Sequence, residues 1–239
     1  MRADSDDMSM RLRGRDVFYV TLVTFGLTSV GIAAIVGLAE ISADNAATSR
    51  KLNLAVLFGS ILLLNGSVFL AVKIVLMRAG EMSWQTLGFV WPGARWFAGA
   101  IALGIILVAT IEGIERAFEI SAGQLTSWLI APDGFTWVGL VGGVLFIGLL
   151  APFGEELLFR GLVYRWLKDL WGPMTAAPIS ATLFASAHFY YPLPHMLLVA
   201  FLGLVLAISY ERSASIWVPI GIHAAQNTTV VVLIYLSLH

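Results

Sequence analysis

Cysteine is absent from this chain of 239 residues. Its absence excludes disulfide bridges, thiolate zinc sites and cysteine nucleophiles. Charged side chains are also scarce, because Asp, Glu, Lys and Arg make up 12% of the residues, whereas an average soluble domain has about 25%. The net charge of -1 argues against a nucleic acid as a partner, since such a partner requires basic patches on the protein.

Hydrophobic residues predominate in the chain. Hydrophobic residues make up 59% of the chain and the mean hydropathy is +0.86, which is typical of a membrane protein. A helix of about 20 apolar residues crosses a hydrocarbon core of about 30 Å. The sequence therefore predicts an all-α fold, a polytopic transmembrane helix bundle that crosses the lipid bilayer about seven times, at residues 17–39, 54–77, 96–115, 136–158, 174–190, 194–210 and 216–237.

Some connections between these spans can also be predicted. The fourth span is expected to continue as a helix to about Lys168, beyond the hydrocarbon. The two prolines of the sequence YYPLPH are expected to end the fifth helix and let the sixth begin. The mixed segment 116–133 is predicted to be a short interfacial helix or a loop.

Basic residues indicate how the bundle is oriented in the membrane. Most of them fall on one side of the predicted spans, namely Arg11, Arg13, Arg15, Lys73, Arg78, Arg95, Arg160, Arg165, Lys168 and Arg212. The link after the third span is acidic, while Arg50 and Lys51 are exceptions on that opposite side. Because short cytoplasmic loops are enriched in Lys and Arg, the sequence predicts a multi-pass protein of the cell membrane with its N-terminus in the cytoplasm.

Three polar motifs interrupt the apolar second half of the chain. The first is EELLFR, in which Glu156 and Arg160 are four residues apart and share one helix face. The second is FASAH, which runs from Phe184 to His188, and the third is HAAQN, which runs from His223 to Asn227. Ionisable groups inside a membrane are costly and usually mark a functional site or a water-filled cavity.

Counting helical rise predicts that these motifs meet. Glu155 and His188 each lie roughly 20 Å from the same membrane side, and His223 and Asn227 lie about 12–18 Å in. These depths cluster near the middle of a core of about 30 Å. The three helices are therefore predicted to present Glu155, His188, His223 and Asn227 to one pocket.

Two kinds of hydrolytic chemistry are open to such a pocket. A glutamate in an apolar pocket is suited to take a proton from water near neutral pH, with a histidine orienting the water or carrying the proton onward. A second histidine and an asparagine can then stabilise the oxygen that becomes negative. Alternatively, two histidines and a glutamate can hold zinc or another divalent metal, here as Glu155, His188 and His223.

Other interpretations of the same residues stay open. The charged motif could be a cytoplasmic helix end with ordinary ion pairs, and the histidines could be interfacial or could serve helix packing. A non-catalytic immunity or scaffolding protein and a proton-coupled transporter are the alternatives to an enzyme. His195 is expected at the membrane interface, and Glu112 and Glu115 are expected to end the third span at the outer surface.

Motifs of other intramembrane proteases are missing. The chain has no His-Glu-x-x-His sequence, no Gly-x-Ser beside a suitable histidine, and no aspartate within a predicted span. EELLFR, FASAH and HAAQN instead resemble the EExxxR, FxxxH and HxxxN/D patterns of the CAAX-protease and bacteriocin-processing family of intramembrane proteases, also called the type II CAAX endopeptidase or ABI family. The resemblance covers roughly residues 130–237.

The resemblance implies a role for each motif residue. Glu155 is implied to be the base that activates water, working with His188, while His223 and Asn227 complete the pocket. Glu156 is also counted among the catalytic residues, since a direct role for the second glutamate is one alternative and a supporting pair is the other. Two residues are implied to be supporting, Arg160 and Phe184.

The resemblance also implies an organisation and a substrate. Residues 1–16 are expected to be a polar cytoplasmic tail, residues 17–129 the N-terminal transmembrane helices, and residues 130–239 a CAAX-protease-like catalytic core. The expected activity is that of a membrane-embedded endopeptidase, dependent on a glutamate or on a metal, acting on a membrane peptide or a lipid-linked protein. The family is commonly classed among metalloproteases, and its eukaryotic members have eight helices, so eight spans is the alternative to seven.

Overall fold

The computed structural model describes residues 14–24, 26–27, 30, 46–77, 83–120, 127, 130–131 and 134–238. The described residues form helices and no strands, so the predicted all-α class is confirmed. The helices are α2 (Ala46–Ala71), η1 (Val72–Met77), α3 (Ala94–Ala117), α5 (Trp137–Gly142), η2 (Gly143–Leu150), α6 (Ala151–Glu156), η3 (Leu157–Tyr164), α7 (Arg165–Trp171), α8 (Pro173–Ser186), α9 (Leu193–Ser213) and α10 (Trp217–Ser237), where η marks a π-helical stretch.

Five of the helices are long and apolar enough to cross a membrane, within the part of the chain that the structure describes. They are Leu54–Ile74, Ala94–Ala117, Trp137–Trp171, Leu193–Ser213 and Trp217–Ser237. These five match the second, third, fourth, sixth and seventh predicted spans. The first predicted span begins as helix at residues 14–24, and most of its second half lies outside the described residues.

The fifth predicted span, residues 174–190, is wrong in its length. Helix α8 has 14 residues and ends at Ser186, so His188 lies in the turn that follows and not on a helix. Gly172, with φ 76°, separates α8 from α7, and Pro173 starts the new helix. The sequence of residues 174–190 predicts one span because its small apolar residues give no signal for the point where the helix ends.

The fourth span is one continuous helical rod from Trp137 to Trp171, so its predicted continuation as a helix to about Lys168 is confirmed. Two π-helical stretches, η2 and η3, lie on either side of the short helix α6. π-Helical turns are rare and frequently occur at functional sites. In this rod they bracket the two glutamates of the first motif.

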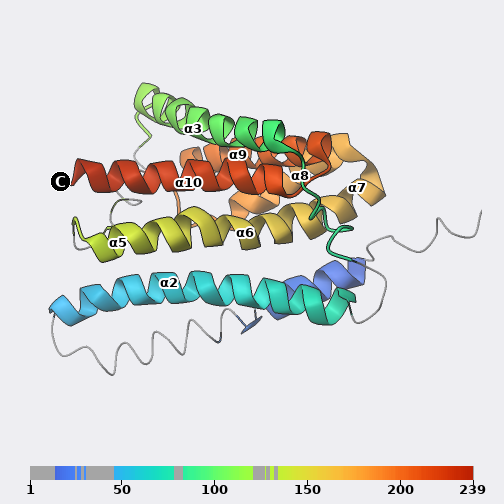
Figure 1. Cartoon of the computed structure of the whole chain (residues 1–239), viewed down its shortest axis with the longest axis horizontal. Helices are drawn as coiled ribbons and strands as arrows, with labels where there is room; N and C mark the ends of the chain where they lie inside the picture. The colour runs from blue at the N-terminus through green and yellow to red at the C-terminus, as the bar shows by residue number, and fades with distance from the viewer. Residues whose placement is uncertain are drawn as a thin grey trace, which may run out of the picture.

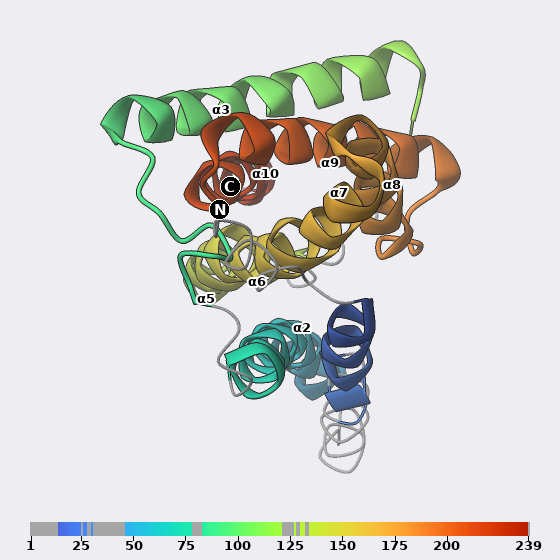
Figure 2. The same cartoon turned by 90° about the vertical axis from the view of Figure 1, so that its right-hand side faces the viewer.

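The helices stack in layers across the bundle, as Figures 1 and 2 show. Helix α3 lies on one side and packs along α10, while α8 packs along α9. The rod from α5 to α7 lies between α10 and α2. Gly104 lets α3 approach α10 closely, because a Cβ at this position would clash with the Ile222 carbonyl oxygen.

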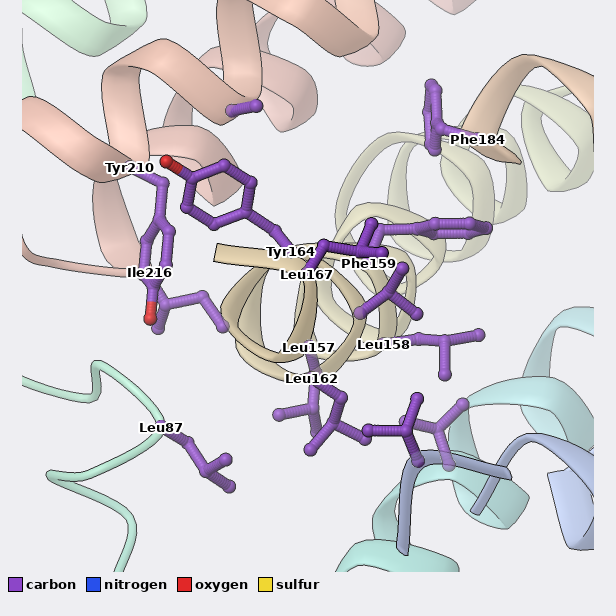
Figure 3. Packing of buried hydrophobic residues seen from close by; sticks show 14 of the residues in the cluster. Leu87, Leu157, Leu158, Phe159, Leu162, Tyr164, Leu167, Phe184, Tyr210 and Ile216 are labelled. Carbon is purple, nitrogen blue, oxygen red and sulfur yellow. The ribbon is translucent and has the colours of Figure 1, made fainter. Parts of the chain in front are cut away.

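The main core surrounds the second half of this rod. Phe159, Leu162 and Tyr164 of η3 are buried and point in different directions, so this segment is packed on several sides (Figure 3). Buried residues of α8, α9 and the start of α10 belong to the same cluster. The core therefore holds the rod in one rotation about its axis, which fixes where the charged motif points.

Candidate active site

Glu156 is the centre of a buried charge network (Glu156, Arg160 and His223). The Arg160 Nη1 atom lies 2.8 Å from Glu156 Oε1, and both side chains are 0% exposed. Arg160 Nη2 also donates to the Gly203 carbonyl of α9 at 2.9 Å. The predicted i,i+4 pair is thus present, and its full burial makes the loss of either partner costly.

His223 joins this network from α10. Its Nδ1 atom lies 2.9 Å from Glu156 Oε1, so in the neutral tautomer this nitrogen carries the proton and donates to the carboxylate. The ring is then oriented with Nε2 toward the other glutamate, at 3.9 Å from Glu155 Oε2. That separation is too long for a hydrogen bond, but a single water can bridge the two atoms.

Glu155 differs from Glu156 in its surroundings. Its side chain is 18% exposed, and its Oε2 atom is buried without a hydrogen-bond partner among the described residues. It also lines a cavity, which Glu156 does not. A buried carboxylate oxygen without a donor is costly, and such an atom beside a cavity is suited to bind water or a substrate group.

His188 approaches the same cavity from the turn after α8. Its Nδ1 atom lies 2.9 Å from the Phe184 carbonyl oxygen, which can only accept, so Nδ1 carries a proton and Nε2 is left free. The Phe184 ring lies between the two histidines, with centroid distances of 4.9 Å to His188 and 5.6 Å to His223. The Arg160 guanidinium lies 4.6 Å from the centre of the same ring, so Phe184 connects the charge network to His188.

Asn227 completes the set from the next turn of α10. Its Nδ2 atom donates to the Ile147 carbonyl of η2 at 3.1 Å, which leaves one amide hydrogen for another partner. All four residues that the depth estimate brought together, Glu155, His188, His223 and Asn227, line one cavity of about 640 Å³. This volume is within the range of about 300–1,000 Å³ that is usual for ligand pockets.

Sequence comparison agrees with this arrangement. Residues 137–229 match the family model "Type II CAAX prenyl endopeptidase Rce1-like", which spans all three motifs. This part of the chain is therefore similar to Rce1-like endopeptidase domains. It is 29% identical over 161 residues to the putative membrane peptidase YdiL of Bacillus subtilis, covering 66% of this chain and 61% of that protein.

A second relative of this chain is an uncharacterized 24.3 kDa protein of Escherichia coli. It is 30% identical over 139 residues, which is 57% of this chain and 62% of that protein. The chain therefore spans about three fifths of the length of the curated relatives it matches. No solved structure matches the chain.

The side chains of the candidate site can be compared with what a metal ion requires. Across the described residues, no three side chains of His, Asp or Glu are arranged to hold a metal ion. Each histidine uses Nδ1 for a protein acceptor, which leaves Nε2 as the atom that could bind a metal. The assignment of Glu155, His188 and His223 as zinc ligands stays a prediction.

Several residues that the sequence analysis did not assign to the site also line the cavity. His195 Nδ1 lies 2.5 Å from Glu115 Oε1, and both side chains are 16% exposed and line the cavity. No sequence pattern predicts a contact between two residues that are 80 positions apart on different helices. Gln226 also lines the cavity, and its buried Oε1 atom has no hydrogen-bond partner in the part of the chain that the structure describes. Its place inside the HAAQN motif was the signal that could have found it.

Tyr190 is a further cavity residue in the turn before α9. Its partial burial, followed by the nearby Tyr191 phenol and the Glu155 charge, raises the pKa of the Tyr190 phenol. The phenol therefore stays protonated at neutral pH and can donate a hydrogen bond at the cavity wall.

Proposed function

We propose that this protein is an intramembrane endopeptidase that hydrolyses a peptide bond of a membrane-associated substrate with water activated by Glu155. The observation that carries the proposal is the contrast between the two adjacent glutamates. Glu156 is 0% exposed, its Oε1 atom accepts from both Arg160 and His223, and it does not line the cavity. Glu155 lies at the cavity wall, and its buried Oε2 atom has no hydrogen-bond partner among the described residues. A packing motif requires only the first kind of glutamate.

The chemistry follows from the free atoms at the cavity. Glu155 takes a proton from water while the water oxygen bonds to the peptide carbonyl carbon, and the C–N bond then breaks as the nitrogen takes that proton. In its neutral form His223 Nε2 accepts a hydrogen bond, so this atom and His188 Nε2 orient the water. The second amide hydrogen of Asn227 is the donor available to the developing oxyanion.

The family description names prenyl endopeptidases, and we propose membrane peptides or lipid-linked peptides as the substrate class. The cavity supports this class because a large group of aliphatic residues, such as Leu57, Ile111 and Val230, lines it. We also propose that the chain crosses the membrane seven times with a cytoplasmic N-terminus. The helix that starts at residue 14 and α8 would add to the five long helices.

The test uses the full chain purified in detergent and a panel of quenched-fluorescence membrane peptides, with and without a prenylated C-terminal cysteine. The Glu155→Gln variant is expected to lose activity by at least about a hundredfold, as is usual when a general base is removed. Glu112→Gln is the matched control, because Glu112 lines the same cavity but pairs with Arg116 at 2.9 Å. Unchanged cleavage by Glu155→Gln ends the proposal.

Metal dependence is decided in the same preparation. Bound metal is measured in the active enzyme, and activity is measured after treatment with a chelator. Activity that persists without metal favours water held by Glu155 and the histidines alone. Activity that is lost and then restored by zinc favours the three predicted ligands.

A non-catalytic membrane protein is the second candidate, and one observation favours it. The buried charge network joins α6, α9 and α10 through Glu156, Arg160 and His223 without needing a substrate. A scaffold would use this network to fix its helices, and Glu155→Gln would then leave its biological activity intact. Complementation of a deletion strain by that variant distinguishes the two functions.

A further inference from the structure

We infer that Gln226 binds the main chain of the substrate next to the bond that is cleaved, an inference that rests on the proposed function. Several buried side-chain atoms of the described residues have no hydrogen-bond partner. Two of these atoms, Glu155 Oε2 and Gln226 Oε1, belong to residues that line the cavity. The proposed mechanism uses Glu155 and gives Gln226 no role, although both side chains have a buried oxygen in the same condition.

Most of the other unpaired atoms lie in helix contacts away from the cavity. An added Cβ at Gly148 of the rod would clash with Thr228 Oγ1, and one at Gly154 would clash with Asn65 Oδ1. Neither Thr228 nor Asn65 lines the cavity. The unpaired atoms of the buried charge network belong to side chains whose other atoms have partners. Gln226 therefore stands apart as a polar side chain at the cavity that helix packing does not explain.

The crossing of α3 and α10 fixes the position of Gln226. A Cβ added to Gly104 of α3 would lie 3.1 Å from the Gln226 main-chain nitrogen and would clash with the Ile222 carbonyl oxygen. The two backbones therefore touch beside Gln226, which restricts movement of its Cα atom. The first α3 residues after this crossing that line the cavity are Val108 and Ile111, whose side chains have no atom that could bind the amide.

Gln226 lies one helical turn beyond His223. Residues three apart on a helix differ by about 4.5 Å in rise and about 60° in rotation, so both side chains lie on the face of α10 that lines the cavity. An extended peptide covers about 3.3 Å per residue. A peptide whose cleaved bond lies at Glu155 and His223 therefore brings a residue that is one or two positions away from this bond to the Gln226 amide.

The Gln226 amide matches the hydrogen-bonding groups of a peptide main chain. A glutamine side chain has an acceptor oxygen and two donor hydrogens, while the main chain of one substrate residue has one donor and one acceptor. The amide can thus donate to the substrate carbonyl and accept from the substrate N–H, as a neighbouring extended strand would. Such a contact does not depend on the substrate side chain, but it excludes proline, which has no N–H.

The test removes the contact from each partner separately. On the protein, Gln226→Met keeps the length of the side chain and removes both hydrogen bonds. Gln85→Met is the matched control, because Gln85 is exposed and does not line the cavity. On the substrate, the best peptide of the quenched-fluorescence panel is N-methylated at one residue at a time, which removes a single N–H in each peptide.

In the unmodified protein and in Gln85→Met, N-methylation at one position within two residues of the cleaved bond should lower kcat/KM roughly tenfold. In Gln226→Met the same N-methylation should change kcat/KM by less than about twofold. The KM of Gln226→Met for the unmethylated peptide should rise roughly tenfold with kcat unchanged, as when a binding contact is lost. Equal sensitivity to N-methylation in Gln226→Met and in the unmodified protein overturns the inference, and so does a fall in kcat with an unchanged KM.

A binding measurement separates this inference from the proposed function. The affinity of the same peptides is measured by fluorescence anisotropy in detergent for the unmodified protein and for Glu155→Gln, each with and without Gln226→Met. Binding that depends on one N–H and on Gln226, without cleavage of any peptide by the unmodified protein, refutes the peptidase while the inference stands. Cleavage that needs Glu155, with no effect of Gln226→Met on the N-methylation pattern, refutes the inference while the peptidase stands. A panel from which no peptide binds refutes both.

Discussion

The two adjacent glutamates allow one substitution to be compared at two neighbouring positions. Changing either to glutamine replaces one carboxylate oxygen by an amide nitrogen of similar size and removes one negative charge. At position 156 this change leaves the Arg160 guanidinium, which is 0% exposed, without its carboxylate partner. Breaking a buried ion pair in this way costs about 3–5 kcal/mol. At position 155 no hydrogen bond is lost, since the described residues give Oε2 no donor.

The expected result is therefore opposite for stability and activity. Glu156→Gln should lower the free energy of unfolding by about 3–5 kcal/mol, whereas Glu155→Gln should change it by less than about 0.5 kcal/mol while abolishing cleavage. Unfolding is followed in detergent by the loss of the monodisperse peak in size-exclusion chromatography after heating. Activity is measured on the fraction that remains folded.

A third variant identifies the cause of the instability. If the loss comes from an unpaired buried charge, replacing both partners by apolar residues should recover much of it, as in Glu156→Leu with Arg160→Met. Equal destabilisation by Glu155→Gln and Glu156→Gln would refute the assignment of separate environments. Full stability of Glu156→Gln would show that the charge network contributes little to the fold.

Three further predictions concern other contacts. Asn227→Ala removes the hydrogen bond to the Ile147 carbonyl and the proposed donor to the oxyanion. The kcat should therefore fall about 10²-fold or more with little change in KM. A fall in stability without a fall in kcat would contradict this role. Gly104→Leu places a side chain against the Ile222 carbonyl and should destabilise the protein by about 1–3 kcal/mol, as measured by thermal unfolding. Gly99→Leu is the control and should not destabilise the protein, because a Cβ at position 99 has open space around it. Glu115→Gln weakens the pair with His195. If that pair restricts access to the cavity, the reactivity of a cysteine introduced at position 230 toward a maleimide should change. Unchanged reactivity would show that the pair does not restrict the cavity.

The long apolar helices were predictable because their signal is strong and local. Residues 96–115 and 216–237, for example, were predicted within two residues of the helices that the structure shows at each end. The Glu156 and Arg160 pair was predictable for the same reason, since an i,i+4 spacing fixes which side chains share a helix face. Depth counting also brought Glu155, His188, His223 and Asn227 to one cavity.

Features that depend on packing between distant segments could not be predicted in the same way. Helix α8 ends at Ser186, before His188, and no glycine or proline in the preceding sequence marks that point. The pair of His195 with Glu115 depends on how α3 lies against α9, which neither local sequence contains. The different environments of Glu155 and Glu156 depend on the rotation of the rod, which the surrounding core sets.

The π-helical stretch η2 affects which side chains of the rod face the cavity. Ile147, Ala151 and Glu155 all line the cavity although they are successively four residues apart, and in a regular α-helix each such step drifts by about 40° around the axis. The wider turn, in which Ala151 N bonds to the Phe146 carbonyl, offsets part of that drift. Deleting one residue from this stretch should rotate the glutamate pair by about 100° relative to everything before it, so chain length here is constrained as strictly as side-chain identity.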